Sequence, residues 1–125
     1  YKTLPTLYQD NILKVSKLFE NIKFICQSFE KSFETVNDDD FIYMDPPYVP
    51  VNTTSFTSYT KGEFNHGELF TGINALKCRW LLSNADVPIL EESVDYDTID
   101  YIECRRAINS KDPASKINEV LISSP

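Results

Sequence analysis

The chain has 125 residues, of which 42% are apolar and 25% charged, and its net charge at pH 7 is −7. This length and composition are typical of a single globular domain with its own core. The acidic balance disfavours a nucleic-acid binder, whose surface is usually basic. No apolar run approaches the ~18–20 residues of a membrane span and no signal-peptide pattern is present, so we expect a cytoplasmic protein without a membrane partner.

The first half of the chain predicts two helical segments and two strands. Apolar residues at helical spacing over 7–19 predict a helix that ends near residues 20–21. Residues 22–26 form a short β-rich run and predict a strand, and residues 28–33 predict a helical turn. An acidic triplet then leads into Phe41–Met44, which is the next predicted strand.

The second half begins with residues 50–63, which are rich in Thr, Ser, Asn and Tyr and predict a loop. Residues 66–76 predict a short helix, although Gly67 and Gly72 interrupt it. Residues 79–82 form a continuous apolar run that predicts a buried strand.

Ser83 and Asn84 close this strand. The last two predicted strands, 99–106 and Lys116–Ser123, flank a polar turn and predict an antiparallel hairpin. Strands that alternate with helices and finish in a hairpin predict an α/β layered domain. In such sheets ligands bind at the carboxyl ends of the strands, which is where Asp45 and Ser83 are expected.

Cysteine and histidine are sparse. The three cysteines, Cys26, Cys78 and Cys104, are far apart and form no CxxC pair, so we expect buried, reduced thiols. Because the chain has a single histidine, His66, a zinc site is not expected.

The tetrapeptide Asp45-Pro46-Pro47-Tyr48 directly follows the predicted strand Phe41–Met44. Prolines cannot donate to a sheet ladder, so they end the strand and stiffen the segment after it. The Asp45 carboxylate and the Pro46 carbonyl could grip both N–H groups of a nucleobase amine and free its lone pair. Tyr48 could stack on a base that has left the duplex, a contact worth ~1–3 kcal/mol. The alternative is a turn that only ends the strand.

Four blocks of sequence, taken in order, resemble the Dam-type (D12 class) DNA adenine-N6 methyltransferases, which use S-adenosylmethionine. They are FICQSFEKSF (24–33), DPPY (45–48), TSFTSYTKGEFN (54–65) and RRAINSKDPASKINEVLISS (105–124). LLSNAD (81–86) fits the Ser-Asn strand end of that family, and YKTLP at the start resembles the segment after its target-recognition domain.

The resemblance implies a partial Rossmann-like class I methyltransferase sheet within an α/β domain. It would comprise strands 3 to 7 of the family's order 3-2-1-4-5-7-6 and end in the antiparallel hairpin, with residues 22–26 as strand 3. Residues 1–125 would form a single catalytic-half domain, because the family's Gly-rich cofactor loop and target-recognition domain have no counterpart here. Residues 41–44 would then leave an open apolar edge. We therefore expect a homodimer, a domain-swapped assembly or pairing with a complementary N-terminal half.

The resemblance also implies roles for the DPPY motif and for one segment before it. Asp45 and Pro46 of the motif would hold the adenine amine, while Tyr48 would stack on the flipped base. Asp45 and Tyr48 would also face the sulfonium methyl of the cofactor. Ser28 and Phe29 correspond to the segment near the cofactor's adenine.

Contacts to double-stranded DNA are implied for two groups of residues, the loop after the motif and the hairpin. They are Ser55, Phe56, Thr57 and Tyr59 in the loop, and Arg105, Arg106, Asn109 and Lys111 in the hairpin. The hairpin residues would approach phosphates, which positions the duplex without reading its sequence. Phe56 and Tyr59 could instead anchor the loop by packing. Two roles are open for Ser83-Asn84, contact with the target or capping of a backbone. Trp80 is expected in the core.

The resemblance as a whole implies a site-specific DNA adenine-N6 methyltransferase, with GATC as the family's commonest target. The alternative is a truncated, catalytically silent remnant that acts at most as a DNA-binding or dimerising module. The acidic net charge and the missing Gly-rich loop favour that alternative for the isolated chain. A DPPY methyltransferase that acts on RNA is disfavoured by the FTSYTK and RRAINSK blocks.

Overall fold

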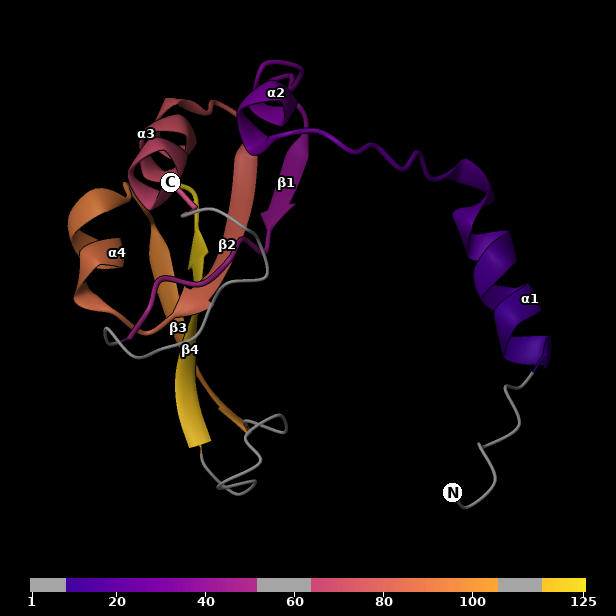
Figure 1. The fold of residues 1–125 in the computed structure, drawn as a ribbon. Coiled ribbons are helices and arrows are strands. Elements are labelled where there is room, and N and C mark those ends of the chain that lie inside the picture. The colour runs from indigo at the N-terminus through magenta and orange to yellow at the C-terminus, as the bar shows by residue number, and fades with distance from the viewer. Residues whose placement is uncertain (1–8, 52–63, 106–115) are drawn as a thin grey trace.

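The computed structural model describes residues 9–51, 64–105 and 116–125 (Figure 1). In chain order the elements are α1 (Gln9–Leu18), the 3-10 turn η1 (Phe19–Asn21), α2 (Phe29–Phe33), β1 (Phe41–Met44), α3 (His66–Ala75), β2 (Arg79–Ala85), α4 (Pro88–Ser93), β3 (Thr98–Arg105) and β4 (Lys116–Ser123). Within the described ranges, no helix has both the length and the apolar character needed to cross a membrane.

The described strands form one open, mixed sheet in the order β1-β2-β4-β3. β1 runs parallel to β2, whereas β4 is antiparallel to both β2 and β3. The predicted hairpin is therefore confirmed, and the strand predicted over Lys116–Ser123 has the predicted bounds. β2 continues through Ser83 and Asn84 to Ala85, three residues beyond the predicted strand, because it pairs there with β4.

The core lies between the sheet and helices α3 and α4, which lie side by side in Figure 1. Its largest fully buried apolar side chains are Leu69 and Ile73 of α3, Leu82 of β2, Leu90 of α4, and Val120 and Ile122 of β4. Trp80 is also buried in this cluster, as predicted. The segment Asp45–Tyr48 thus follows β1, whose neighbour β2 is firmly packed.

Helix α3 is confirmed despite its two glycines. Asn65 is its N-cap residue, whose side-chain oxygen accepts a hydrogen bond from the backbone N–H of Glu68 at 3.1 Å. A Cβ atom on Gly72 would come within 2.9 Å of the Phe33 ring, so this glycine lets α2 approach α3 closely. Helix α4 was not predicted. It has only six residues, and Pro88 in its first turn is the main signal for it.

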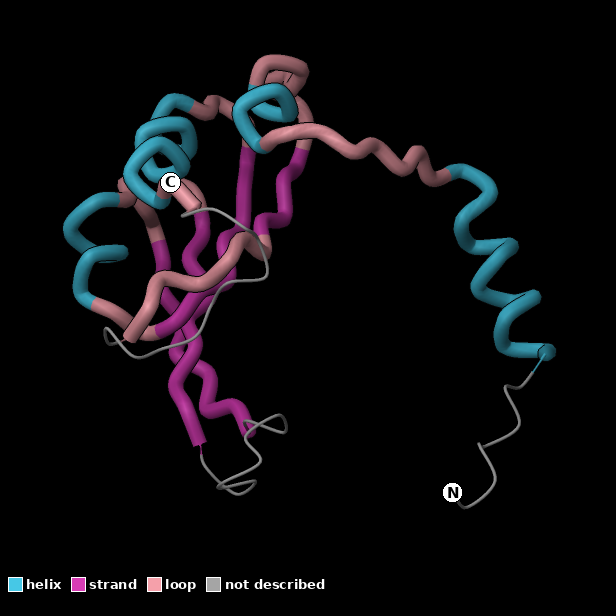
Figure 2. Tube along the Cα trace, viewed as in Figure 1, coloured by secondary structure: helices cyan, strands magenta, loops and turns pink. Residues whose placement is uncertain are grey.

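Helix α1 confirms the first predicted helix but lies apart from the sheet, as Figure 2 shows. Among the described elements it contacts only η1. Its apolar side chains, which include Ile12, Leu13, Val15 and Leu18, are exposed.

The strand predicted over residues 22–26 is wrong. This segment is not a strand in the structure, and Phe24 in it is 74% exposed. A strand needs a neighbour to satisfy its backbone N–H and C=O groups, and none of the described strands pairs with these residues. The sequence of this segment has the apolar pattern of a strand, but none of the described strands pairs with it.

β1 forms an edge of the described sheet, as expected. Phe41 is 59% exposed, and Tyr43, on the same strand face, is also exposed. An exposed apolar edge of this kind is a site for pairing with another strand.

The cysteines are free, but they do not share the expected burial. Cys78 is buried, where burial raises the pKa of its thiol, and Cys104 is half-buried. Cys26 is exposed because it lies in the extended segment that follows α1, so the expectation of burial was wrong for this residue.

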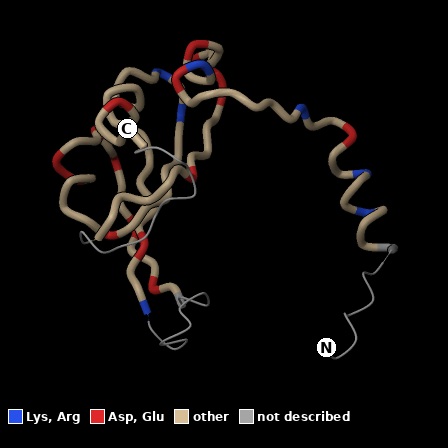
Figure 3. The backbone as a smooth tube through the Cα atoms, viewed as in Figure 1, with Lys and Arg blue, Asp and Glu red and all other residues tan. Residues whose placement is uncertain are grey.

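Charged side chains are distributed unevenly over the described backbone (Figure 3). Lys14 and Lys17 lie on α1, whereas Glu91 and Glu92 lie on α4. On the hairpin, Lys116 pairs with Glu103 across the two strands at 2.6 Å. Both side chains are exposed, so this ion pair adds little to stability.

Candidate active site

Asp45 lies at the carboxyl end of β1, beside Ser83 of β2. The parallel register pairs Met44 with Leu82, so the residues that follow each of them are neighbours. The Ser83 hydroxyl donates to the Asp45 Oδ1 at 3.0 Å and accepts from the Tyr43 hydroxyl at 3.3 Å. Ser83 is buried and Asp45 is exposed, so a fixed carboxylate faces solvent at this end of the sheet. Asp45 thus lies at the carboxyl end of a strand, as predicted, and its contact with Ser83 is a finding of the structure.

Asn84, the next residue of β2, holds the backbone after the motif. It is 0% exposed, and its Oδ1 accepts from the Val49 N–H and from the Ala85 N–H, both at 2.9 Å. Its Nδ2 is buried and has no hydrogen-bond partner in the described part of the chain. Of the two roles left open for Ser83-Asn84, the structure gives Asn84 that of capping a backbone.

His66, the first residue of α3, contacts the motif from the other side. Its Nε2 lies 2.8 Å from the Pro47 carbonyl oxygen. A carbonyl oxygen only accepts, so Nε2 carries a hydrogen and donates. The ring packs against Phe64 and Phe70, with centroids 5.0 and 6.2 Å away. From the sequence, His66 was examined only as a possible zinc ligand. The spacing of His66 along the chain gives no sign that it contacts the DPPY motif.

Tyr48 is half-buried beside two carboxylates. Burial is the main cause that raises the pKa of its phenol, and Glu119 and Asp45 raise it further, while a hydrogen bond with Ser83 lowers it. The Tyr48 hydroxyl lies 3.4 Å from the Glu119 Oε2, a long and weak hydrogen bond. The Tyr48 phenol is thus neutral at physiological pH. Glu119, on β4, was not among the predicted site residues.

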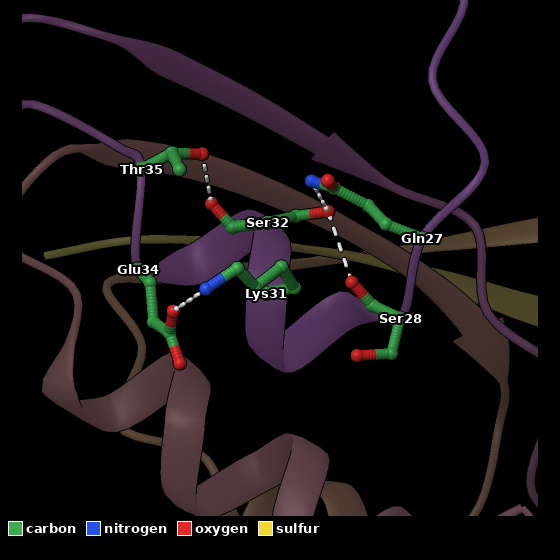
Figure 4. A network of polar contacts seen from close by, with 6 residues as sticks. All are labelled: Gln27, Ser28, Lys31, Ser32, Glu34 and Thr35. Carbon is green, nitrogen blue, oxygen red and sulfur yellow. Dashed lines mark hydrogen bonds and ion pairs between the residues drawn. The ribbon is translucent and has the colours of Figure 1, made fainter.

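Ser28 and Phe29 lie at the start of α2, which contacts α3, whereas Asp45 follows the end of β1. The Ser28 carbonyl accepts from the backbone N–H and the hydroxyl of Ser32, both at 3.2 Å, and its own hydroxyl caps no N–H (Figure 4). The Phe29 ring packs against Phe64, with centroids 5.5 Å apart. Phe64 in turn contacts His66, which contacts the DPPY motif. The predicted cofactor segment at Ser28 and Phe29 is therefore linked to the motif through packed side chains and not by direct contact.

The remaining predicted DNA contacts lie outside the described residues, apart from Arg105 at the end of β3. Those outside are Ser55, Phe56, Thr57, Tyr59, Arg106, Asn109 and Lys111. Their roles stay predictions.

Comparison with known proteins shows the family of the chain. Residues 3–108 match the family described as D12 class N6 adenine-specific DNA methyltransferase, and the chain belongs to this family. It is 35% identical to the type II methyltransferase M.MjaIII of Methanocaldococcus jannaschii over 98% of its length, and 31% identical to M1.LlaDCHI of Lactococcus lactis over 99%. It is 28% identical to the DNA adenine methylase of Escherichia coli K12 over 82%. The chain spans 46%, 47% and 40% of these relatives, about half of their length.

Proposed function

We propose that the protein takes part in transfer of a methyl group from S-adenosylmethionine to the exocyclic amine of an adenine flipped out of double-stranded DNA. The observation that carries this proposal is the exposed Asp45 carboxylate, which Ser83 holds at the end of β1 beside the half-buried Tyr48. The names of the relatives and the matched family support the same reaction.

In this reaction Asp45 and Pro46 would accept hydrogen bonds from the two N–H groups of the adenine amine. The Pro47 carbonyl accepts from His66, and the resemblance to the family implies the Pro46 carbonyl as the acceptor for the amine. The Asp45 charge would also stabilise the positive charge that develops on the nitrogen as it attacks. Tyr48 would stack on the base and hold it against these acceptors.

The chemistry of the described residues fits one part of S-adenosylmethionine. Its sulfonium is a cation, and both the Asp45 carboxylate and the Tyr48 ring attract cations. When bound, the cofactor supplies an electrophilic methyl group. Ser28, which is exposed, would lie toward its adenine, and Phe29 would support that segment by packing. The described glycines, Gly67 and Gly72, both lie in α3, so a Gly-rich cradle would come from outside the described residues.

The observed order β1-β2-β4-β3 fits strands 4-5-7-6 of a Rossmann-like methyltransferase sheet. On this assignment residues 1–125 form a catalytic-half domain. The strands that would extend the sheet beyond β1 would be supplied by a complementary N-terminal half, or replaced by a second copy of the chain.

The isolated 125-residue chain is therefore expected to self-associate through the β1 edge. Phe41→Lys places a charge on that edge and should shift the chain toward monomer, because an edge lysine opposes strand pairing. Sedimentation velocity over a range of concentrations measures the shift. Ile102→Lys, at the opposite edge of the described sheet on β3, is the matched control and should leave association unchanged. A stable wild-type monomer at all concentrations would contradict edge pairing.

Binding of S-adenosylmethionine, measured by calorimetry, is the first test of the proposed function. A second is transfer of a labelled methyl group to GATC-containing and scrambled duplexes. We expect binding and transfer from a protein that supplies the whole cofactor site. If the chain alone binds no cofactor, it does not catalyse independently. Duplex binding without transfer would favour the second candidate, a catalytically silent module, which the net charge of −7 and the scarcity of glycine favour for the isolated chain.

A further inference from the structure

Both peptide groups that flank Tyr48 are held by side chains from other elements. The Pro47 carbonyl belongs to the peptide bond that enters Tyr48, and it accepts from His66 at 2.8 Å. The Val49 N–H belongs to the peptide bond that leaves Tyr48, and it donates to Asn84 at 2.9 Å. We propose that His66 and Asn84 are positioning residues that fix the backbone of Tyr48 and thereby the direction of its ring. This inference rests on the proposed function.

The geometry makes this restraint effective. Peptide bonds are planar, so holding one polar group in each of the two adjacent peptides restricts φ and ψ of the residue between them. The two anchors come from β2 and α3, whose neighbouring side chains Leu82 and Leu69 are fully buried. A ring direction set by such rigid elements costs less ordering when a base stacks on it.

The side chain of Asn84 connects the segment after β1 to β2 where backbone hydrogen bonds between the two strands have ended. The β1–β2 ladder ends at the pair Met44 and Leu82, and the two prolines that follow have no N–H to continue it. The Asn84 Oδ1 accepts from two N–H groups, so rotating the amide would bring its NH₂ against two donors. Its orientation is therefore determined by the contact with Val49.

The cost of this arrangement also points to positioning. The Nδ2 of Asn84 is buried without a partner in the described residues, which is unfavourable. An apolar side chain of similar size would fill the same space without that penalty. The amide is explained by the bond that it makes to the Val49 N–H, next to Tyr48.

His66 is itself held in place. Its ring lies between Phe64 and Phe70, and Phe64 also contacts Phe29. The imidazole therefore connects the start of α2 with the Pro47 carbonyl. A displacement of that segment on cofactor binding would be transmitted to the peptide bond before Tyr48.

The test compares Asn84→Ala and His66→Phe with wild type in the full chain. His66→Phe keeps an aromatic ring between Phe64 and Phe70 but removes the donor. Loss of the hydrogen bond to Val49 or to Pro47 is expected to speed amide exchange in a peptide covering residues 45–51 about tenfold. It should also lower kcat about tenfold. The KM for duplex should change less than about threefold. Hydrogen-exchange mass spectrometry and single-turnover methyl transfer provide the two measurements.

Two further variants separate positioning from general stability. Asn84→Asp retains an oxygen acceptor and should restore the protection of the Val49 N–H relative to Asn84→Ala. Asn74→Ala removes an asparagine that also accepts a backbone N–H, that of Asp95 at 2.9 Å, but far from the motif in the chain. It should lower thermal stability and leave exchange in residues 45–51 and kcat unchanged.

The outcomes are distinguishable. If Asn84→Ala and His66→Phe match wild type in both exchange and kcat, or if Asn74→Ala reduces kcat as much as they do, the positioning role is overturned. If wild type transfers no methyl group even in a protein that supplies the whole cofactor site, the proposed function fails, whereas exchange in residues 45–51 still decides whether the two side chains hold the backbone.

Discussion

Asp45→Asn is expected to lower the rate of methyl transfer by about 10²–10³-fold, the usual effect of removing one electrostatic group from an active site. The amide has the size of the carboxylate and keeps an oxygen that can accept from Ser83, which is now 3.0 Å away. What it loses is the negative charge that attracts the amine and stabilises the developing cation. The rate is measured in single turnover with labelled cofactor, at saturating cofactor and duplex.

A matched charge change elsewhere serves as the control for this result. Asp39→Asn removes the same charge from the exposed acidic loop that precedes β1, and it should leave the rate unchanged. Transfer by Asp45→Asn at the wild-type rate would mean that the carboxylate does not grip the amine. In that case the contact between Ser83 and Asp45 would be only structural.

The largest loss of stability is expected from Leu82→Ala. Leu82 lies in β2 opposite Met44 on one side and Ile122 on the other, and it is 0% exposed. Truncation removes buried apolar surface and leaves a cavity between strands that cannot easily close. We expect the free energy of unfolding to fall by about 2–5 kcal/mol. Urea denaturation followed by circular dichroism measures the change.

Leu13→Ala is the matched control, because Leu13 on α1 is 56% exposed and faces no other described element. Leu13→Ala should change the free energy of unfolding by no more than about 0.5 kcal/mol, the usual range for surface substitutions. A cost as large as that of Leu82→Ala would show that α1 packs against the rest of the protein in solution, and would contradict the exposed position described above.

Much of the fold could be predicted because its periodicities are local. β1 and β4 were predicted with their observed bounds, and the hairpin followed from the polar turn between two strand patterns. The error at residues 22–26 has the opposite cause. Strand formation depends on a neighbour, and sequence pattern alone cannot tell whether one is present. Helix α4 was missed because six residues contain too little periodicity to recognise.

The part of the candidate site that is contiguous in the sequence could be predicted. The residues that only the fold brings to the site could not. Asp45 and Tyr48 stand in one tetrapeptide whose chemistry is recognisable. His66 contacts that tetrapeptide only because Asn65 starts α3 at the right place, and Glu119 approaches Tyr48 only through the β2–β4 pairing. These contacts depend on tertiary geometry, for which the spacing of the residues along the chain carries no signal.

The extended connection after α1 has a consequence for how two copies of the chain would associate. Residues 22–28 can span at most about 25 Å, at ~3.3–3.6 Å per residue. Among the described elements α1 contacts only η1, but so short a tether keeps it near its own sheet at an effective concentration in the millimolar range. Docking of α1 onto the sheet of a second copy would have to compete with docking onto its own sheet, so we expect it only in concentrated solution. Pairing at the β1 edge has no such competitor among the described strands, so it should begin at much lower protein concentration.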